Sequence, residues 1–161
     1  MATPTALPAA FTVGQVLGSS DMNLLRGAVR VLQVVNATYA TSGSSTSSSY
    51  ADTGLTVTIT PTSSTSKVLV ICNLTLYNSA ASTSAALKLL RGATTVVNTT
   101  GYAFSTGGTQ SADPMIMALD SPATTSATIY KLQYARESGA GSVFVFPNNN
   151  HGQITVMEIS A

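Results

Sequence analysis

The sequence predicts an all-β fold, an antiparallel, jelly-roll-like β-sandwich of about eight strands. Three observations favour it. From residue 29 onward, β-branched residues dominate and apolar and polar residues tend to alternate with the two-residue period of a strand. Clusters of Gly, Ser, Asn and Pro interrupt these segments at short intervals, as turns do. No strand–helix–strand spacing occurs, which disfavours a nucleotide-binding α/β fold.

The clearest strand signal lies in residues 55–60. Leu55, Val57 and Ile59 would face one side and the intervening threonines the other, until Pro61 ends the strand. Other strands are expected in the segments 29–41, 66–79, 85–98, 114–120, 125–137, 142–147 and 153–160. The third of these is expected to bend or to turn as a hairpin at Arg91-Gly92.

The central strands supply the predicted core. The apolar positions expected to be buried are Val68, Val70, Leu74, Leu132 and Val156. The single cysteine, Cys72, lies in the same apolar context and is expected to be a small buried residue.

The serine-rich run of residues 42–50 could be a tether between domains or a loop inside one fold. Strand signals occur on both sides of it, and a lone strand before it could not form a domain, so we expect a solvent-exposed loop within one domain. The predicted organisation is an N-terminal arm with a short docking helix over residues 1–28, the helix near 20–27, followed by the β-sandwich over residues 29–161.

Composition excludes several classes of function. Only 8% of the residues are charged and the net charge is +1, without a basic cluster, so neither nucleic acid nor a membrane is an expected partner. With one Cys and one His, an internal disulfide cannot form and a zinc site within one chain is not expected. A signal peptide and a membrane span are also disfavoured.

No catalytic constellation or cofactor motif is recognisable, so we expect neither an enzyme nor a cofactor. The six acids stand apart in sequence, and a glycosidase-like acid pair would require two of them to converge in space. His151 lies in a loop composition that favours an exposed histidine, with a metal or ligand contact between subunits as the alternative. Tyr50, Tyr77 and Tyr102 lie near strand ends, either as aromatics at the rim of the core or as a sugar-binding face.

Apolar residues on both faces of some strands indicate self-association, because one sandwich core covers only one face of each strand. The predicted subunit interface is Leu69, Ile71, Phe144 and Phe146. Residues expected in loops that face a receptor are Ser45, Tyr50, Asn149 and His151.

Two parts of the chain resemble proteins of bacteriophage particles. Residues 11–29, "FTVGQVLGSSDMNLLRGAV", resemble the N-terminal attachment segment of tail-fibre and minor tail proteins. The segments 31–41, 50–70, 119–134 and 154–160 resemble phage virion β-sandwich proteins of the tail-fibre, minor tail or head-decoration type.

This resemblance implies a non-enzymatic structural component of a phage virion, assembled in the host cytoplasm as a homotrimer. A tail-fibre or appendage subunit, docked through its arm to a tail, portal-proximal or capsid protein, is slightly favoured over a capsid decoration (cement) protein. The docking residues would be Phe11, Val16, Leu17, Met22 and Leu25. A carbohydrate-binding module is a further alternative, a glycan-cleaving enzyme a third, and a host surface glycan a further candidate partner.

Overall fold

In a computed structural model, the structure describes residue 18 and residues 30–102 and 107–160, and nearly all of this part is β-structure. The elements are β1 (Val31–Tyr39), β2 (Gly43–Ser45), β3 (Ala51–Ile59), β4 (Lys67–Asn73), β5 (Leu76–Asn78), β6 (Ser84–Arg91), β7 (Thr94–Tyr102), β8 (Gln110–Ala112), β9 (Met115–Asp120), β10 (Thr128–Ser138), β11 (Val143–Val145), the 3-10 turn η1 (Pro147–Asn149) and β12 (Gly152–Ile159). The predicted arm and helix fall outside the described residues, apart from Gly18.

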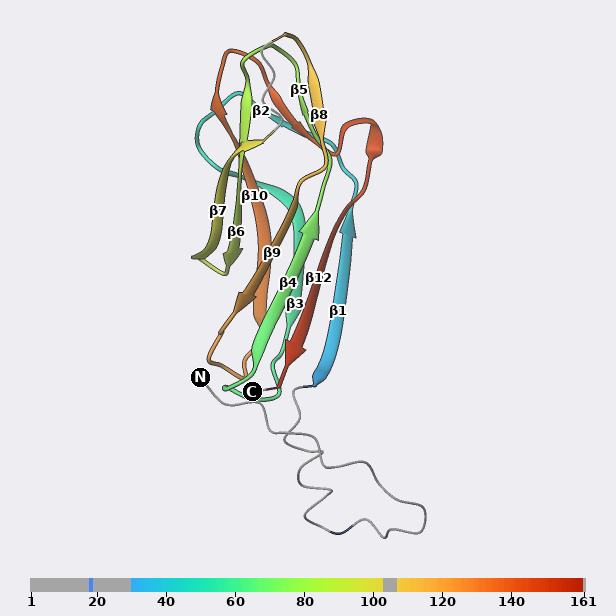
Figure 1. Ribbon diagram of the computed structural model, residues 1–161, viewed down its shortest axis with the longest axis vertical. Coiled ribbons are helices and arrows are strands. Elements are labelled where there is room, and N and C mark those ends of the chain that lie inside the picture. The colour runs from blue at the N-terminus through green and yellow to red at the C-terminus, as the bar shows by residue number, and fades with distance from the viewer. Residues whose placement is uncertain (1–17, 19–29, 103–106, 161) are drawn as a thin grey trace.

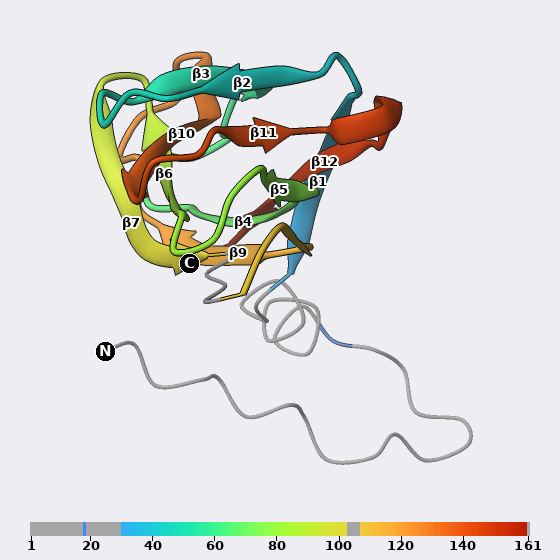
Figure 2. The ribbon, with the colours of Figure 1, turned by 90° about the horizontal axis from the view of Figure 1, so that it is seen from above.

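Two four-stranded antiparallel sheets form the body of the molecule. The first sheet has the order β1-β12-β4-β9 and the second the order β3-β10-β6-β7. The two sheets lie face to face as separate layers (Figures 1 and 2). Because the chain passes repeatedly from one sheet to the other, non-consecutive strands become neighbours, which is the topology of a jelly roll. The predicted all-β sandwich is therefore confirmed.

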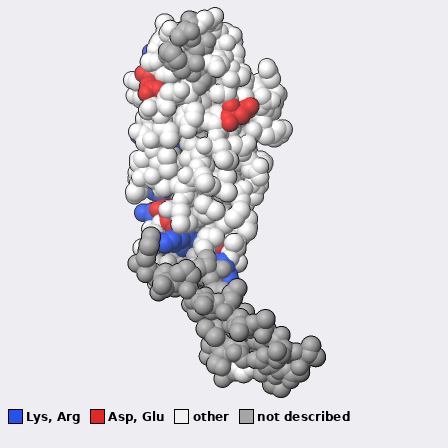
Figure 3. Space-filling view, viewed as in Figure 1, with Lys and Arg blue, Asp and Glu red and all other residues white. Residues whose placement is uncertain are grey.

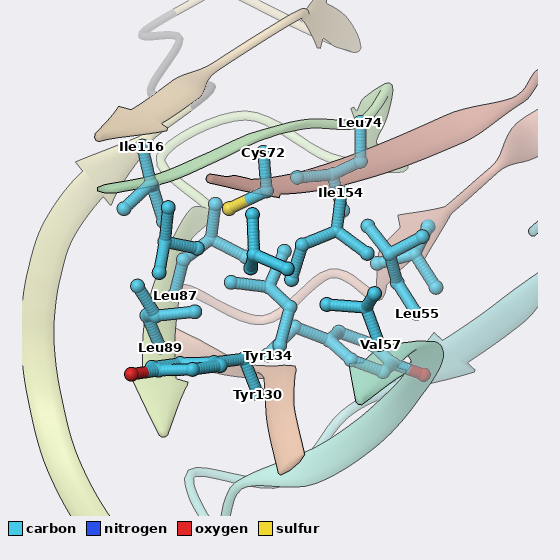
Figure 4. Packing of buried hydrophobic residues seen from close by; sticks show 14 of the residues in the cluster. Leu55, Val57, Cys72, Leu74, Leu87, Leu89, Ile116, Tyr130, Tyr134 and Ile154 are labelled. Carbon is cyan, nitrogen blue, oxygen red and sulfur yellow. The ribbon is translucent and has the colours of Figure 1, made fainter. Parts of the chain in front are cut away.

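The core lies between these sheets, where the apolar side chains of their two inner faces meet. Cys72, Ile116 and Ile154 of the first sheet point toward Leu87 and Leu89 of the second (Figure 4). All five residues predicted as core are buried, with at most 1% of each exposed. Cys72 is buried as expected, and burial raises the pKa of its thiol to about 12.

A third, shorter sheet closes one end of the sandwich, and we call it the end sheet. Its order is β2-β11-β5-β8, and each of these three-residue strands lies within one of the connections that cross between the two main sheets. The end sheet lies at the top of Figure 1, whereas β1 begins and β12 ends at the bottom. The predicted exposed loop of residues 42–50 is thus part of a single fold, although it contains the strand β2.

At the opposite end, Arg30, which precedes β1, and Ser160, which follows β12, lie side by side. The backbone N–H of Ser160 donates to the carbonyl of Arg30 at 2.8 Å, and the N–H of Arg30 donates to the Ser160 hydroxyl, also at 2.8 Å. Residues 1–29 are therefore joined to the sandwich at the end far from the end sheet.

Candidate functional site: an apolar sheet face and an end groove

The outer side of the first sheet carries a continuous set of apolar side chains, which we call the apolar face. The strand register aligns Leu119, Leu69, Met157 and Val34 in one row across all four strands. The apolar face comprises Val34, Leu69, Ile71, Met115, Met117, Leu119 and Met157.

The exposure of this face is large for such residues. Met115, Met117 and Leu119 are 63%, 61% and 60% exposed, and Val34 is 57% exposed. Figure 3 views the molecule from this side and shows an almost uncharged surface along the middle of the sheet. Contiguous apolar surface of this kind is uncommon on monomers and is typical of surfaces that contact another molecule.

The outer side of the second sheet is more polar, although it includes the exposed side chain of Ile129. Lys131 forms a 3.0 Å ion pair with Asp52, and Gln133 donates a 2.7 Å hydrogen bond to the same carboxylate. The Gln133 and Lys131 contacts lower the pKa of Asp52 against the opposing effect of burial. The ammonium of Lys88 lies 3.7 Å from the centre of the Tyr50 ring. The two outer faces of the sandwich therefore differ, and the first is the more suited to apolar contact.

A second feature lies on the end sheet. Phe144 pairs with Tyr77 across β11 and β5, and Tyr77 pairs with Ser111 across β5 and β8. The rings of Tyr77 and Phe144 are half-buried, with centroids 5.7 Å apart and planes inclined at 54°. They form part of a groove of about 560 Å³, which we call the end groove. Its described lining is Ser42, Tyr77, Ser111, Phe144, Pro147, Asn148 and Asn150.

One wall of the end groove is the turn that follows β11, and Phe146 anchors this turn. Its backbone is left-handed, with φ of 52°, and its side chain is completely buried. The ring packs edge-on against the ring of Tyr39, with 5.6 Å between the two ring centroids. It also fills the space beside Gly152, where an added Cβ would overlap it. Pro147, Asn148 and Asn150 are thereby held at the rim.

Burial of Phe146 corrects the sequence-based interpretation. Strict alternation placed Phe144 and Phe146 together on an outer face, but the left-handed turn rotates Phe146 into the core. Phe146 is therefore not available to a partner. Phe144 remains partly exposed, but it lines the end groove and does not share a surface with Leu69 and Ile71.

Leu69 and Ile71 lie on the apolar face, half-buried between their neighbours on β9 and β12. The sequence-based prediction missed the most exposed residues of this face, although residues 115–119 carry the same signal, apolar side chains at both parities. The proposed docking residues Phe11, Val16, Leu17, Met22 and Leu25 lie outside the described residues.

The four residues assigned to receptor-facing loops are not brought together as one site. The Ser45 hydroxyl accepts a 3.1 Å hydrogen bond from the N–H of Ser47. Tyr50 lies against the second sheet, where its hydroxyl donates to Asn98 at 2.7 Å. Asn149 belongs to η1, and His151 lies two residues further along the chain as an exposed residue.

Two other features are absent from the described ranges. In the described ranges, no group of three His, Cys, Asp or Glu side chains is placed to hold a metal ion. In the same ranges, no helix has the length and apolar character needed to cross a membrane.

Comparison with known proteins gives a likeness in structure. No family model matches the sequence, and no curated protein matches it. Among solved structures, the chain is similar to VP2 of the infectious bursal disease virus subviral particle, with 14% identity and a TM-score of 0.33. The match covers 79% of this chain and 39% of VP2, so the chain spans about two fifths of that protein's length.

Proposed function

We propose that this chain is a non-enzymatic structural subunit of a bacteriophage particle and works as a self-associated assembly. The observation that carries the proposal is the apolar face. Full burial of a side chain of this size from water is worth about 1.5–3 kcal/mol. The exposed part of each side chain on this face would contribute a share of that gain if the face were covered. Because the opposite face is more polar, we expect another molecule to cover the apolar face alone.

The occupant we propose for the apolar face is another copy of this chain. No charged side chain lies in the row of Leu119, Leu69, Met157 and Val34 or in the adjacent row of Met117, Ile71, Thr155 and Asn36, so two copies would meet there without like-charge repulsion or a buried unpaired charge. Three-fold symmetry follows from the resemblance to phage virion proteins.

Within this role, a tail-fibre or appendage subunit is favoured over a capsid decoration protein. The sandwich has two distinct ends, with the N-terminal segment joined at Arg30 and the end groove at the other. Docking through residues 1–28 would point the end groove away from the particle. A decoration protein is the alternative, since a sandwich with one apolar face could also lie against a shell.

Self-association is tested by sedimentation of the recombinant chain at micromolar concentration. The wild type should sediment as an oligomer, and Met117→Lys should sediment as a monomer with an unchanged circular dichroism spectrum. Thr58→Lys, on the outer side of the second sheet, is the matched control and should keep the wild-type mass. A monomeric wild type would overturn the proposed use of the apolar face.

The virion role is tested on purified particles with antibody raised against the chain. Gold label confined to the tail supports an appendage subunit, and label spread over the head supports a decoration protein. Absence of the chain from purified particles contradicts both.

A further inference from the structure

We infer that the end groove binds a neutral saccharide, with one sugar ring seated against Tyr77 and Phe144. The inference deepens the proposed function by naming a ligand class, and it rests on that function only for the direction in which the groove faces. Binding itself is a property of the sandwich.

The size of the groove suits one or two sugar rings. Its volume of about 560 Å³ falls within the range of about 300–1,000 Å³ typical of small-molecule sites. The two half-buried rings offer an apolar platform, and sugars present C–H faces that can pack on such a platform while their hydroxyls stay at the edge.

The polar lining determines the class of ligand. Ser42, Ser111, Asn148 and Asn150 each supply both donors and acceptors, as hydroxyl groups require. No Lys, Arg, Asp or Glu is among the described lining residues, so nothing there would pair with a carboxylate, phosphate or amine. This combination favours a neutral saccharide over an anionic one.

The groove is also held in shape before any ligand arrives. Phe146 and Asn148 both have left-handed backbone conformations, with φ of 52° and 56°. Strain of this kind costs about 1–3 kcal/mol for each residue and persists only where the surroundings enforce it. Burial of the Phe146 ring against Tyr39 and Gly152 provides that enforcement. A site already ordered loses less conformational freedom on binding.

The test measures binding by calorimetry and ligand-observed NMR. The neutral probes are methyl glycosides of glucose, galactose, N-acetylglucosamine and N-acetylgalactosamine and their disaccharides, and sialyllactose is the anionic comparison. A synthetic peptide of residues 1–10 of this chain is included, because aromatic grooves also bind proline-containing segments. We expect at least one neutral probe to bind and the peptide not to bind.

Two variants locate the binding. Phe144→Ala removes half of the ring platform, and Asn148→Gly removes an amide while keeping a residue that tolerates positive φ. Each should weaken binding about tenfold or more, the equivalent of about 1.4 kcal/mol. Tyr50→Ala, an aromatic deletion on the second sheet, is the matched control and should bind like the wild type. Asn148→Gly keeps the test valid should Phe144→Ala not fold.

Three outcomes would overturn the inference. The first is that no neutral probe binds, and the second is that Asn148→Gly binds as well as the wild type. The third is that the protein prefers the peptide or sialyllactose. These failures are separable from failure of the virion role. A chain found on particles but unable to bind sugar refutes only the inference, whereas a sugar-binding chain absent from particles refutes the proposed function.

Discussion

The Tyr130 hydroxyl donates a 2.7 Å hydrogen bond to Oδ2 of Asp120, and this bond joins the two main sheets of the sandwich. Arg91 forms a 2.7 Å ion pair with the same oxygen, so a carboxylate at the end of β9 is held by two side chains of the second sheet. Burial and the neighbouring Asp120 raise the pKa of the Tyr130 phenol, which keeps it a donor. A polar tie therefore fixes how the two sheets lie against each other at this end.

Removing the tie should destabilise the protein in a graded way. Tyr130→Phe deletes one donor and should cost about 1 kcal/mol, whereas Asp120→Ala removes the acceptor of Tyr130 and the ion pair of Arg91, which keeps the Ser121 carbonyl, and should cost about 2–3 kcal/mol. The double variant should cost less than the sum of the single ones, because both lose the same bond. Urea unfolding curves measure all three, and strictly additive losses would show that the bond contributes nothing.

Glu158 predicts how stability depends on pH. Its side chain is fully buried, and its carboxylate accepts hydrogen bonds from the amide of Gln33 at 2.6 Å and from the N–H and hydroxyl of Thr62, both at 2.8 Å. Burial alone would raise the pKa of Glu158, but these hydrogen bonds outweigh it and lower the pKa from 4.5 to about 2. This is worth about 3 kcal/mol at neutral pH, at about 1.4 kcal/mol for each pKa unit.

Because the pKa is lower in the folded protein, this stabilisation is present above pH 4.5 and is lost as the pH falls from there toward 2. The free energy of unfolding of the wild type should fall steeply over that interval. Glu158→Gln should be less stable at neutral pH and should show a shallower decline, because its side chain does not titrate. Parallel curves for the two proteins would contradict the role assigned to Glu158.

Leu74 and Leu132 test the core from opposite sheets. Leu74 lies just beyond β4 and Leu132 lies in β10, and at most 1% of either is exposed. Substitution of either by Ala should cost about 2–5 kcal/mol, through lost burial and the cavity left behind. Thermal melts give the measurement, with Thr58→Ala as an exposed control. Unchanged melting of both leucine variants would show that these side chains do not pack as described.

Truncation tests the independence of the sandwich. Every strand pairing of the described structure lies between residues 31 and 159, and Arg30 and Ser160 close the far end. Deletion of residues 1–28 should leave a domain that melts cooperatively near the wild-type temperature but no longer enters particles. If the truncated chain does not fold, the arm is part of the core.

The sequence predicts the long strands well because their information is local. Leu55, Val57 and Ile59 alternate with threonines, and each is buried as the alternation requires. The end sheet was predicted only in part. Its strands β5 and β11 lie within the expected strand segments 66–79 and 142–147, whereas β2 and β8 are too short to show a period. The pairing of these strands joins distant parts of the chain and has no local signal. The apolar face was predicted in part, through Leu69 and Ile71, since apolar residues at both parities indicate a second apolar face.

The end groove was missed for a more specific reason. Its shape depends on the left-handed backbone at Phe146, and a bulky residue is not expected at positive φ. The only cue in the sequence is Gly152, and its meaning depends on a ring that comes from six residues earlier.

That contact gives the last prediction, which concerns Gly152→Ala. The added methyl group would occupy the space of the Phe146 ring, so the ring must shift and the turn that carries Pro147 and Asn148 must shift with it. Overpacking of this kind costs about 1–3 kcal/mol. Neither Gly152 nor Phe146 is among the described lining residues of the end groove, so any effect on saccharide binding is transmitted through the turn. We expect a lower melting temperature together with binding weakened about tenfold, equivalent to about 1.4 kcal/mol.

Gly92→Ala is the control for a glycine substitution. Gly92 lies at the β6–β7 turn with φ of 56°, and the space around its Cβ position is open. This substitution should lower stability without changing saccharide binding. If Gly152→Ala loses stability but binds saccharide as the wild type does, the Phe146 anchor does not shape the groove.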